Sequence, residues 1–147
     1  MKDDVFFDTN VIVYLFDKSE DRKHKIAKTL FQEGLRKYNS FISVQVINEF
    51  IVIASQKIKK PLLLNEVKKI AEFLSDTLNV RPLEFATCMS AIKVKNKYNL
   101  SFWDSLVISS ALESECKVLY TEDLQDGLMI NDKLTIKNPF KKNRYKQ

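Results

Sequence analysis

Short apolar runs alternate with longer segments of mixed polarity along this chain of 147 residues. Val5–Phe7, Phe41–Val44 and Lys117–Tyr120 are short and mostly apolar, which is typical of strands buried inside a sheet. Asn79–Pro82 and Leu134–Ile136 are further candidates of the same kind. The pattern therefore predicts about four to five strands, spread from one end of the chain to the other.

Between these runs, apolar residues recur at the three- and four-residue spacing of amphipathic helices. The helices expected on this basis cover residues 11–16, 20–36, 45–58, 65–78, 85–98 and 101–115. Strands separated by helices form parallel sheets, because parallel neighbours need long crossover connections. We therefore expect a single α/β domain, with a central and mostly parallel sheet flanked by helices.

Composition supports this fold and excludes others. The chain is 45% hydrophobic and contains only 2 Gly and 3 Pro, which favours long helices over a β-sandwich or barrel. The apolar run at the start is too short for a signal peptide, and no segment has the length of a membrane span. Cys88 and Cys116 lie in apolar patterns, so we expect reduced thiols in a cytoplasmic protein. Five aromatic residues at core spacing are assigned to packing: Phe31, Phe41, Phe50, Phe73 and Phe85.

The net charge of +5 is concentrated at one end. Residues 137–147 hold five of the 24 basic residues and no acid, which leaves 19 basic residues against 19 acidic residues in 1–136. The sequence thus predicts a neutral domain over 1–136 and a basic C-terminal tail over 137–147. The tail either contacts nucleic-acid phosphates or is simply a solvated terminus. Its candidate contacts are Lys141, Lys142, Arg144 and Lys146.

Four acids fall at equivalent places in the predicted fold. Asp8 ends the first strand, and Asp123 follows the strand Lys117–Tyr120. Glu49 and Asp104 lie in the opening turns of helices. Ligands bind beyond the carboxyl ends of strands in open parallel sheets, so all four acids are expected at one edge.

Several carboxylates that lie close together cannot all stay ionised without a compensating cation. Oxygen ligands select hard ions, so Mg²⁺ or Mn²⁺ is the expected cofactor. The sequence has no Cys/His zinc spacing and no phosphate-binding glycine loop, and its single histidine is His24. These observations point to metal-assisted chemistry on an anionic substrate.

Each acid also has a purely structural interpretation. Asp8 suits a turn, and Glu49 fits a solvent-facing helix position. Asp104 completes the Ser-x-x-Asp pattern of a helix capping box. Asp123 and Asp126 fit an ordinary loop that ends at a glycine. Their joint placement, more than any single residue, favours a functional site.

Four stretches carry a family resemblance: Val5–Asn10 (VFFDTN), Val46–Glu49 (VINE), Phe102–Ser105 (FWDS) and Tyr120–Gly127 (YTEDLQDG). In this order and helix–strand context, they resemble the PIN-domain family, and within it the VapC-like toxins of toxin–antitoxin pairs. The resemblance extends over most of the chain.

The resemblance implies four catalytic acids that bind one or two Mg²⁺ or Mn²⁺ ions: Asp8, Glu49, Asp104 and Asp123. It also implies Asp126 as a further metal ligand. Three polar residues are implied as supports of the acids: Thr9, Asn10 and Thr121.

The implied activity is an endoribonuclease that leaves 5′-phosphate and 3′-hydroxyl ends. The implied partners are an RNA substrate, an antitoxin that covers the acidic groove, and a second copy in a homodimer. Two alternatives remain: a PIN nuclease of RNA processing or repair, and a catalytically silent module that binds RNA or protein.

Overall fold

A computed structural model describes residues 2–142 of the chain. Within them, the strands are β1 (Asp4–Phe7), β2 (Asn39–Ser43), β3 (Asn79–Arg81), β4 (Val118–Tyr120), β5 (Met129–Ile130) and β6 (Leu134–Lys137). The helices are α1 (Thr9–Phe16), α2 (Asp21–Lys37), α3 (Val44–Gln56), α4 (Leu64–Thr77), α5 (Phe85–Tyr98) and α6 (Phe102–Glu113).

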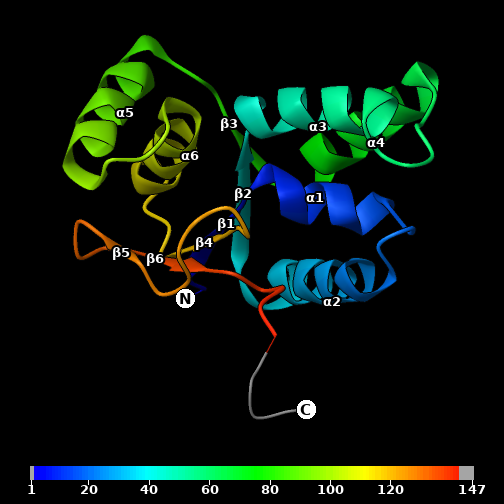
Figure 1. The fold of residues 1–147 in the computed structure, drawn as a ribbon, viewed down its shortest axis with the longest axis horizontal. Coiled ribbons are helices and arrows are strands. Elements are labelled where there is room, and N and C mark those ends of the chain that lie inside the picture. The colour runs from blue at the N-terminus through cyan, green and yellow to red at the C-terminus, as the bar shows by residue number, and fades with distance from the viewer. Residues whose placement is uncertain (1, 143–147) are drawn as a thin grey trace.

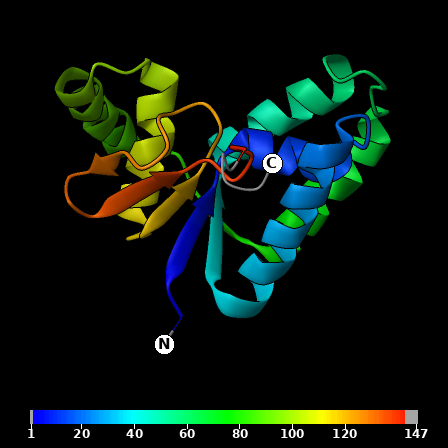
Figure 2. The same cartoon turned by 60° about the horizontal axis from the view of Figure 1, so that its bottom comes forward.

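All the strands belong to one sheet with the order β3-β2-β1-β4-β6-β5. Every neighbouring pair is parallel except β5–β6. Figure 2 shows β1 (dark blue) between β2 (cyan) and β4 (yellow). The predicted α/β fold with a mostly parallel sheet is confirmed, and β5 is the strand that the sequence did not reveal.

Helices cover the sheet on two sides, with α1 to α4 on one side and α5 and α6 on the other (Figure 1). The fully buried side chains of Phe6, Ile42 and Leu119 lie on the central strands. Gly34 brings α2 close to β1, because a Cβ at this position would lie 2.8 Å from Cζ of Phe7. The core is therefore built around the strands that carry the predicted acids at their ends.

Some aromatic residues assigned to packing are instead exposed. Phe85 is 78% exposed and Phe73 is 47% exposed, although Phe50 is buried as predicted. Trp103 on α6 is also 64% exposed. Helical spacing marks an apolar face, but it does not say whether another element covers that face. Among the described residues, no helix is both long enough and apolar enough to cross a lipid bilayer.

The residues that directly follow position 136 pack against the domain. Strand β6 includes Lys137, and Phe140 is only 4% exposed. The Phe140 ring packs edge-on against Tyr14, with 5.0 Å between the ring centroids, and Arg22 Nη2 donates to its carbonyl oxygen at 2.6 Å. The first residues after β6 are therefore fixed against α1 and α2.

Candidate active site

The sheet has a topological switch point between β1 and β4. From β1 the sheet continues through β2 and β3 on one side, and through β4 and β6 on the other. Such a switch leaves a crevice at the carboxyl ends of the strands, where ligands bind in α/β sheets. A pocket of about 550 Å³ includes the four predicted acids in its walls: Asp8, Glu49, Asp104 and Asp123.

Asp8 is the most firmly held of these acids. It follows β1 and caps α1, with Oδ1 accepting from the backbone N–H of Thr9 at 2.7 Å. Its Oδ2 accepts from the hydroxyl of Thr121 at 2.8 Å. Burial raises the pKa of Asp8 to about 7, against these two hydrogen bonds, and the charges of Asp123 and Glu49 raise it further. The Asp8 carboxyl, with a pKa of about 7, is therefore only partly ionised near neutral pH, and a bound cation would favour its charged form.

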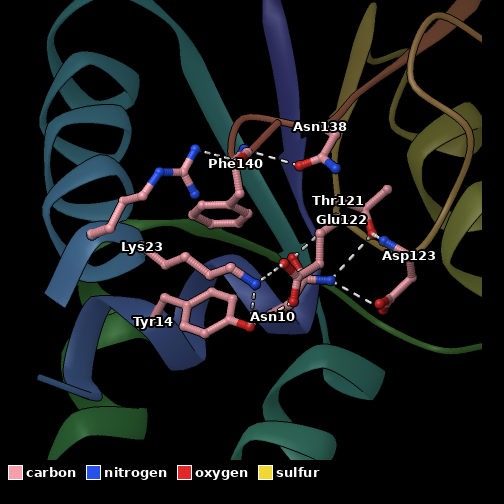
Figure 3. A network of polar contacts seen from close by, with 9 residues as sticks. Asn10, Tyr14, Lys23, Thr121, Glu122, Asp123, Asn138 and Phe140 are labelled. Carbon is pink, nitrogen blue, oxygen red and sulfur yellow. Dashed lines mark hydrogen bonds and ion pairs between the residues drawn. The ribbon is translucent and has the colours of Figure 1, made fainter. Parts of the chain in front are cut away.

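Asn10 and Thr121 join Asp8 to Asp123. Figure 3 shows the contacts of Asn10 and Thr121 with Asp123. Asn10 Nδ2 donates to Thr121 Oγ1 at 3.2 Å and to Asp123 Oδ2 at 3.0 Å. Thr121 Oγ1 also accepts from the Asp123 backbone N–H at 3.1 Å. Burial raises the pKa of Asp123, partly offset by the Asn10 hydrogen bond. The predicted supporting residues thus fix two acids that come from different strands.

Glu49 and Asp104 approach from helices α3 and α6. The hydroxyl of Thr9 donates to Glu49 Oε1 over a long 3.4 Å. Burial raises the pKa of Glu49, and the charges of Asp104 and Asp123 add to this effect. The N–H of Asp104 donates to Ser101 Oγ at 3.1 Å, which caps α6, while Asp104 also lines the pocket. Asp104 therefore takes part in the helix cap through its backbone and also lies in the pocket wall.

A second network holds the loop of Asp123 through its neighbour Glu122 (Figure 3). The Tyr14 hydroxyl donates to Glu122 Oε1 at 2.6 Å, and Lys23 Nζ lies 2.8 Å from Glu122 Oε2. Lys23 Nζ also donates to the Tyr14 hydroxyl at 3.2 Å. Burial and the Glu122 hydrogen bond raise the pKa of Tyr14. Glu122 is thereby tied to α1 and α2, while its neighbour Asp123 lines the pocket.

Other predicted site residues lie elsewhere. Asp126 is outside the pocket wall, where its carboxylate accepts from the Asn138 N–H at 2.8 Å and lies 3.6 Å from Lys141 Nζ. Lys141 and Lys142 are exposed and do not line the pocket. Arg144 and Lys146 lie outside the described residues.

The pocket also contains residues that the sequence did not single out. Gln45 is 5% exposed, and its Nε2 donates to the Trp103 carbonyl at 3.2 Å. Within the described part of the chain, Gln45 Oε1 has no hydrogen-bond partner. Lys57 lines the opposite end of the pocket. Gln45 lies four residues before Glu49 and Lys57 lies eight residues after it, so all three fall on the same helical face. This helical spacing is the one sequence feature that could have pointed to Gln45 and Lys57.

The pocket suits a hard divalent cation in its chemistry. Its acids offer only oxygen ligands, and Gln45 Oε1 is a further acceptor without a partner. Among residues 2–142, no three Asp, Glu, His or Cys side chains are already gathered as a ligand set. The donor types therefore fit Mg²⁺ or Mn²⁺.

Comparisons with known proteins give the family. No curated protein matches the chain in sequence. A toxin–antitoxin complex from Klebsiella pneumoniae contains a similar chain, with 18% identity and a TM-score of 0.66 over 92% of this chain and 97% of the other. VapBC-1 from nontypeable Haemophilus influenzae gives 22% identity and a TM-score of 0.65 over 94% and 99%.

VapC20 of Mycobacterium tuberculosis, a sarcin–ricin loop cleaving toxin, gives 18% identity and a TM-score of 0.63 over 81% of this chain and 89% of the other. At these identities, the three structures share the fold with this chain. The family model of the PIN domain matches residues 5–125, which include all four acids of the pocket. The chain belongs to the PIN domain family.

Proposed function

We propose that this protein is a divalent-metal-dependent endoribonuclease and the toxin of a toxin–antitoxin pair. One observation carries the nuclease proposal: four carboxylates from four separate elements line one pocket at the switch point of a PIN fold. Similar chains in solved toxin–antitoxin complexes support the toxin assignment. The sarcin–ricin loop cleaved by one of these proteins supports RNA as the substrate class.

Mg²⁺ or Mn²⁺ would be held by the four acids of the pocket: Asp8, Glu49, Asp104 and Asp123. A bound ion supplies charge stabilisation at a phosphoryl oxygen and lowers the pKa of a water molecule. Thr121 and Asn10 keep Asp8 and Asp123 oriented toward the same space. We leave Asp126 out of the ligand set, because its carboxylate holds the backbone of Asn138.

The test is the cleavage of total cellular RNA by purified protein with Mn²⁺, with EDTA, and by Asp8→Asn with Mn²⁺. Cleavage is expected only for the unchanged protein with Mn²⁺, and the products should carry 5′-phosphate and 3′-hydroxyl ends. Asp76→Asn is the matched control, because Asp76 is exposed on α4 outside the pocket. Cleavage that persists in EDTA, or that leaves 2′,3′-cyclic ends, would refute the metal-dependent mechanism.

The proposed partners are an antitoxin protein and a second copy of the chain, in the cytoplasm. Solved neighbours described as toxin–antitoxin complexes support the antitoxin. Exposed apolar side chains such as Phe85 and Leu64, at 78% and 69% exposure, support contacts with other proteins. Light scattering on the purified chain tests the homodimer. Co-expression with the product of a neighbouring short gene tests the antitoxin, which should co-purify and block cleavage.

A further inference from the structure

Four lysines surround the end of the pocket that lies farthest along α3. Lys57 and Lys59 line the pocket that contains the four acids. Lys18 and Lys60 line a second hollow, and the two hollows share Ile58 in their walls. These lysines come from the turn after α1 and the turn after α3. Two separate loops therefore bring positive charge to one rim of an otherwise acidic pocket.

The charges of these lysines are not neutralised by contacts within residues 2–142. All four side chains are exposed, and none of them takes part in an ion pair in this part of the chain. By contrast, Lys23 and Lys141 are paired with acids. The acids at this end are Asp17 and Glu20, which also line the pocket.

Asp17 is buried and already accepts hydrogen bonds from the backbone N–H and the hydroxyl of Ser19. Glu20 is exposed. Four positive charges therefore face two negative charges at this rim, and an excess of positive charge attracts polyanions.

Helix α3 connects the acids to this rim. Glu49 and Ile53 lie four residues apart on α3, Lys57 follows four residues later as the C-cap of this helix, and all three line the pocket. A rise of about 1.5 Å per residue places Lys57 roughly 12 Å from Glu49 along the helix. A nucleic-acid strand with one phosphate at the acids therefore continues toward the lysines, where phosphate contacts fix its position without reading its sequence.

We propose that Lys18, Lys57, Lys59 and Lys60 form a phosphate-binding rim that holds the RNA strand on one side of the cleaved bond. This inference rests on the proposed nuclease function. It places an electrostatic contact with RNA at the two turns beside the pocket, in addition to the C-terminal tail that the sequence offered as a candidate. The contact is with the sugar–phosphate backbone, so it strengthens binding of different RNA sequences alike.

The test uses Asp8→Asn protein, in which binding is measured without cleavage. A fluorescent single-stranded RNA is titrated by anisotropy at several KCl concentrations, with and without the added pair Lys57→Gln and Lys59→Gln. Each phosphate contact on a single strand contributes about 0.7 to the slope of log K against log salt, so the pair should reduce the slope by about 1.4. The control pair is Lys68→Gln and Lys69→Gln, which are exposed on α4 outside the pocket, and it should leave the slope unchanged.

The outcomes separate this inference from the proposed function. The salt slope could stay unchanged in the Lys57 and Lys59 double variant while the unchanged protein binds and cleaves RNA. This result would refute the phosphate-binding rim and leave the proposed nuclease function standing. Equal losses in the two lysine pairs would also overturn it, because the effect would then reflect net charge alone. Failure of the unchanged protein to bind or cleave RNA would overturn both. Melting curves with Mn²⁺ check that the lysine variants still fold and still bind the ion.

Discussion

The two halves of the acidic pocket are built differently. On the strand side, both oxygens of Asp8 and one oxygen of Asp123 accept hydrogen bonds from neighbouring residues, at 2.7 to 3.0 Å. On the helix side, Glu49 accepts one long bond of 3.4 Å, and the bond recorded for Asp104 uses its backbone N–H. The strand side is therefore held by more and shorter hydrogen bonds than the helix side.

This difference follows from where each acid sits. Asp8 and Asp123 follow adjacent parallel strands, so sheet pairing brings their backbones together without any help from the carboxylates. Glu49 and Asp104 project from separate helices, and their approach is opposed by charge repulsion and by desolvation. The carboxylates of both sides therefore need a cation to offset their charge, and the strand side is the better held of the two.

The largest expected effect is on the pH dependence of the metal-free protein. Because the pKa of Asp8 rises from 3.8 to about 7 on folding, the folded state binds more protons, and its stability should fall as pH rises between these values. The full shift corresponds to about 4 kcal/mol in the free energy of unfolding. Asp8→Asn should therefore melt higher than the unchanged protein at pH 8 in EDTA, and the two should converge near pH 4.

Glu49→Gln is the matched variant on the helix side. Burial also raises the pKa of Glu49, so this variant should gain stability at pH 8 in the same direction, but less than Asp8→Asn. Thermal unfolding from pH 4 to pH 8 measures both. A larger gain for Glu49→Gln would reverse the contrast between the two halves.

Bound Mn²⁺ should offset most of the stability that the metal-free protein loses when buried Asp8 ionises. At 100 times its dissociation constant, an ion that binds only the folded state raises the free energy of unfolding by about 2.7 kcal/mol. Asp8→Asn should lose this stabilisation, while Glu49→Gln should keep part of it, since the strand side is already in place. Calorimetric melting at pH 7.5 with increasing Mn²⁺ measures the effect, with Asp76→Asn as the control. No shift in the unchanged protein would argue against a shared ion site.

Two threonines allow a smaller test of the same contrast. Thr121→Val removes the hydroxyl that donates to buried Asp8 at 2.8 Å, and such a loss costs about 1–3 kcal/mol. Thr9→Val removes only the 3.4 Å bond to Glu49 and should cost less than about 1 kcal/mol, since long hydrogen bonds are weak. Urea unfolding at pH 7.5 compares the two variants. Equal losses would show that both halves are held alike.

The smallest effect is expected for the network of Tyr14, Lys23 and Glu122. Glu122→Gln removes the ion pair with Lys23. The Glu122 side chain is 21% exposed and the Lys23 side chain 31%, so the free energy of unfolding should change by less than about 1 kcal/mol. The Tyr14 hydrogen bond can persist with the amide. A loss above about 2 kcal/mol in urea unfolding would show that this network, and not Asn10 with Thr121, fixes the loop of Asp123.

The parts of the fold that the sequence predicted are those with a repeating local pattern. Val5–Phe7 is apolar without interruption because β1 is buried in the middle of the sheet. Strand β5 consists only of Met129 and Ile130 and is defined by its pairing with β6. Two residues are too few to form a hydrophobic pattern that predicts a strand. Phe85 has core spacing but is exposed, because the presence of a covering element is a property of the whole fold.

The same distinction applies to the site. Asp8 and Asp123 could be placed at one edge of the sheet because each follows a predicted parallel strand, and the structure brings them to one pocket. Gln45 and Lys57 could not be chosen in advance, since helical spacing to Glu49 is shared by many residues that never meet a ligand. Asp126 has the composition of a ligand, but its carboxylate holds the backbone after β6.

The two edges of the sheet limit how another chain can attach. One edge strand, β3, has three residues, and the other, β5, has two and runs antiparallel to its neighbour. A peptide that added itself as a new strand would gain few main-chain hydrogen bonds at either edge, and short edge strands are a common protection against aggregation. A protein partner must therefore obtain its affinity from the helices and from side chains. Lengthening β5 by design would create an exposed edge strand that can pair with the strands of other chains.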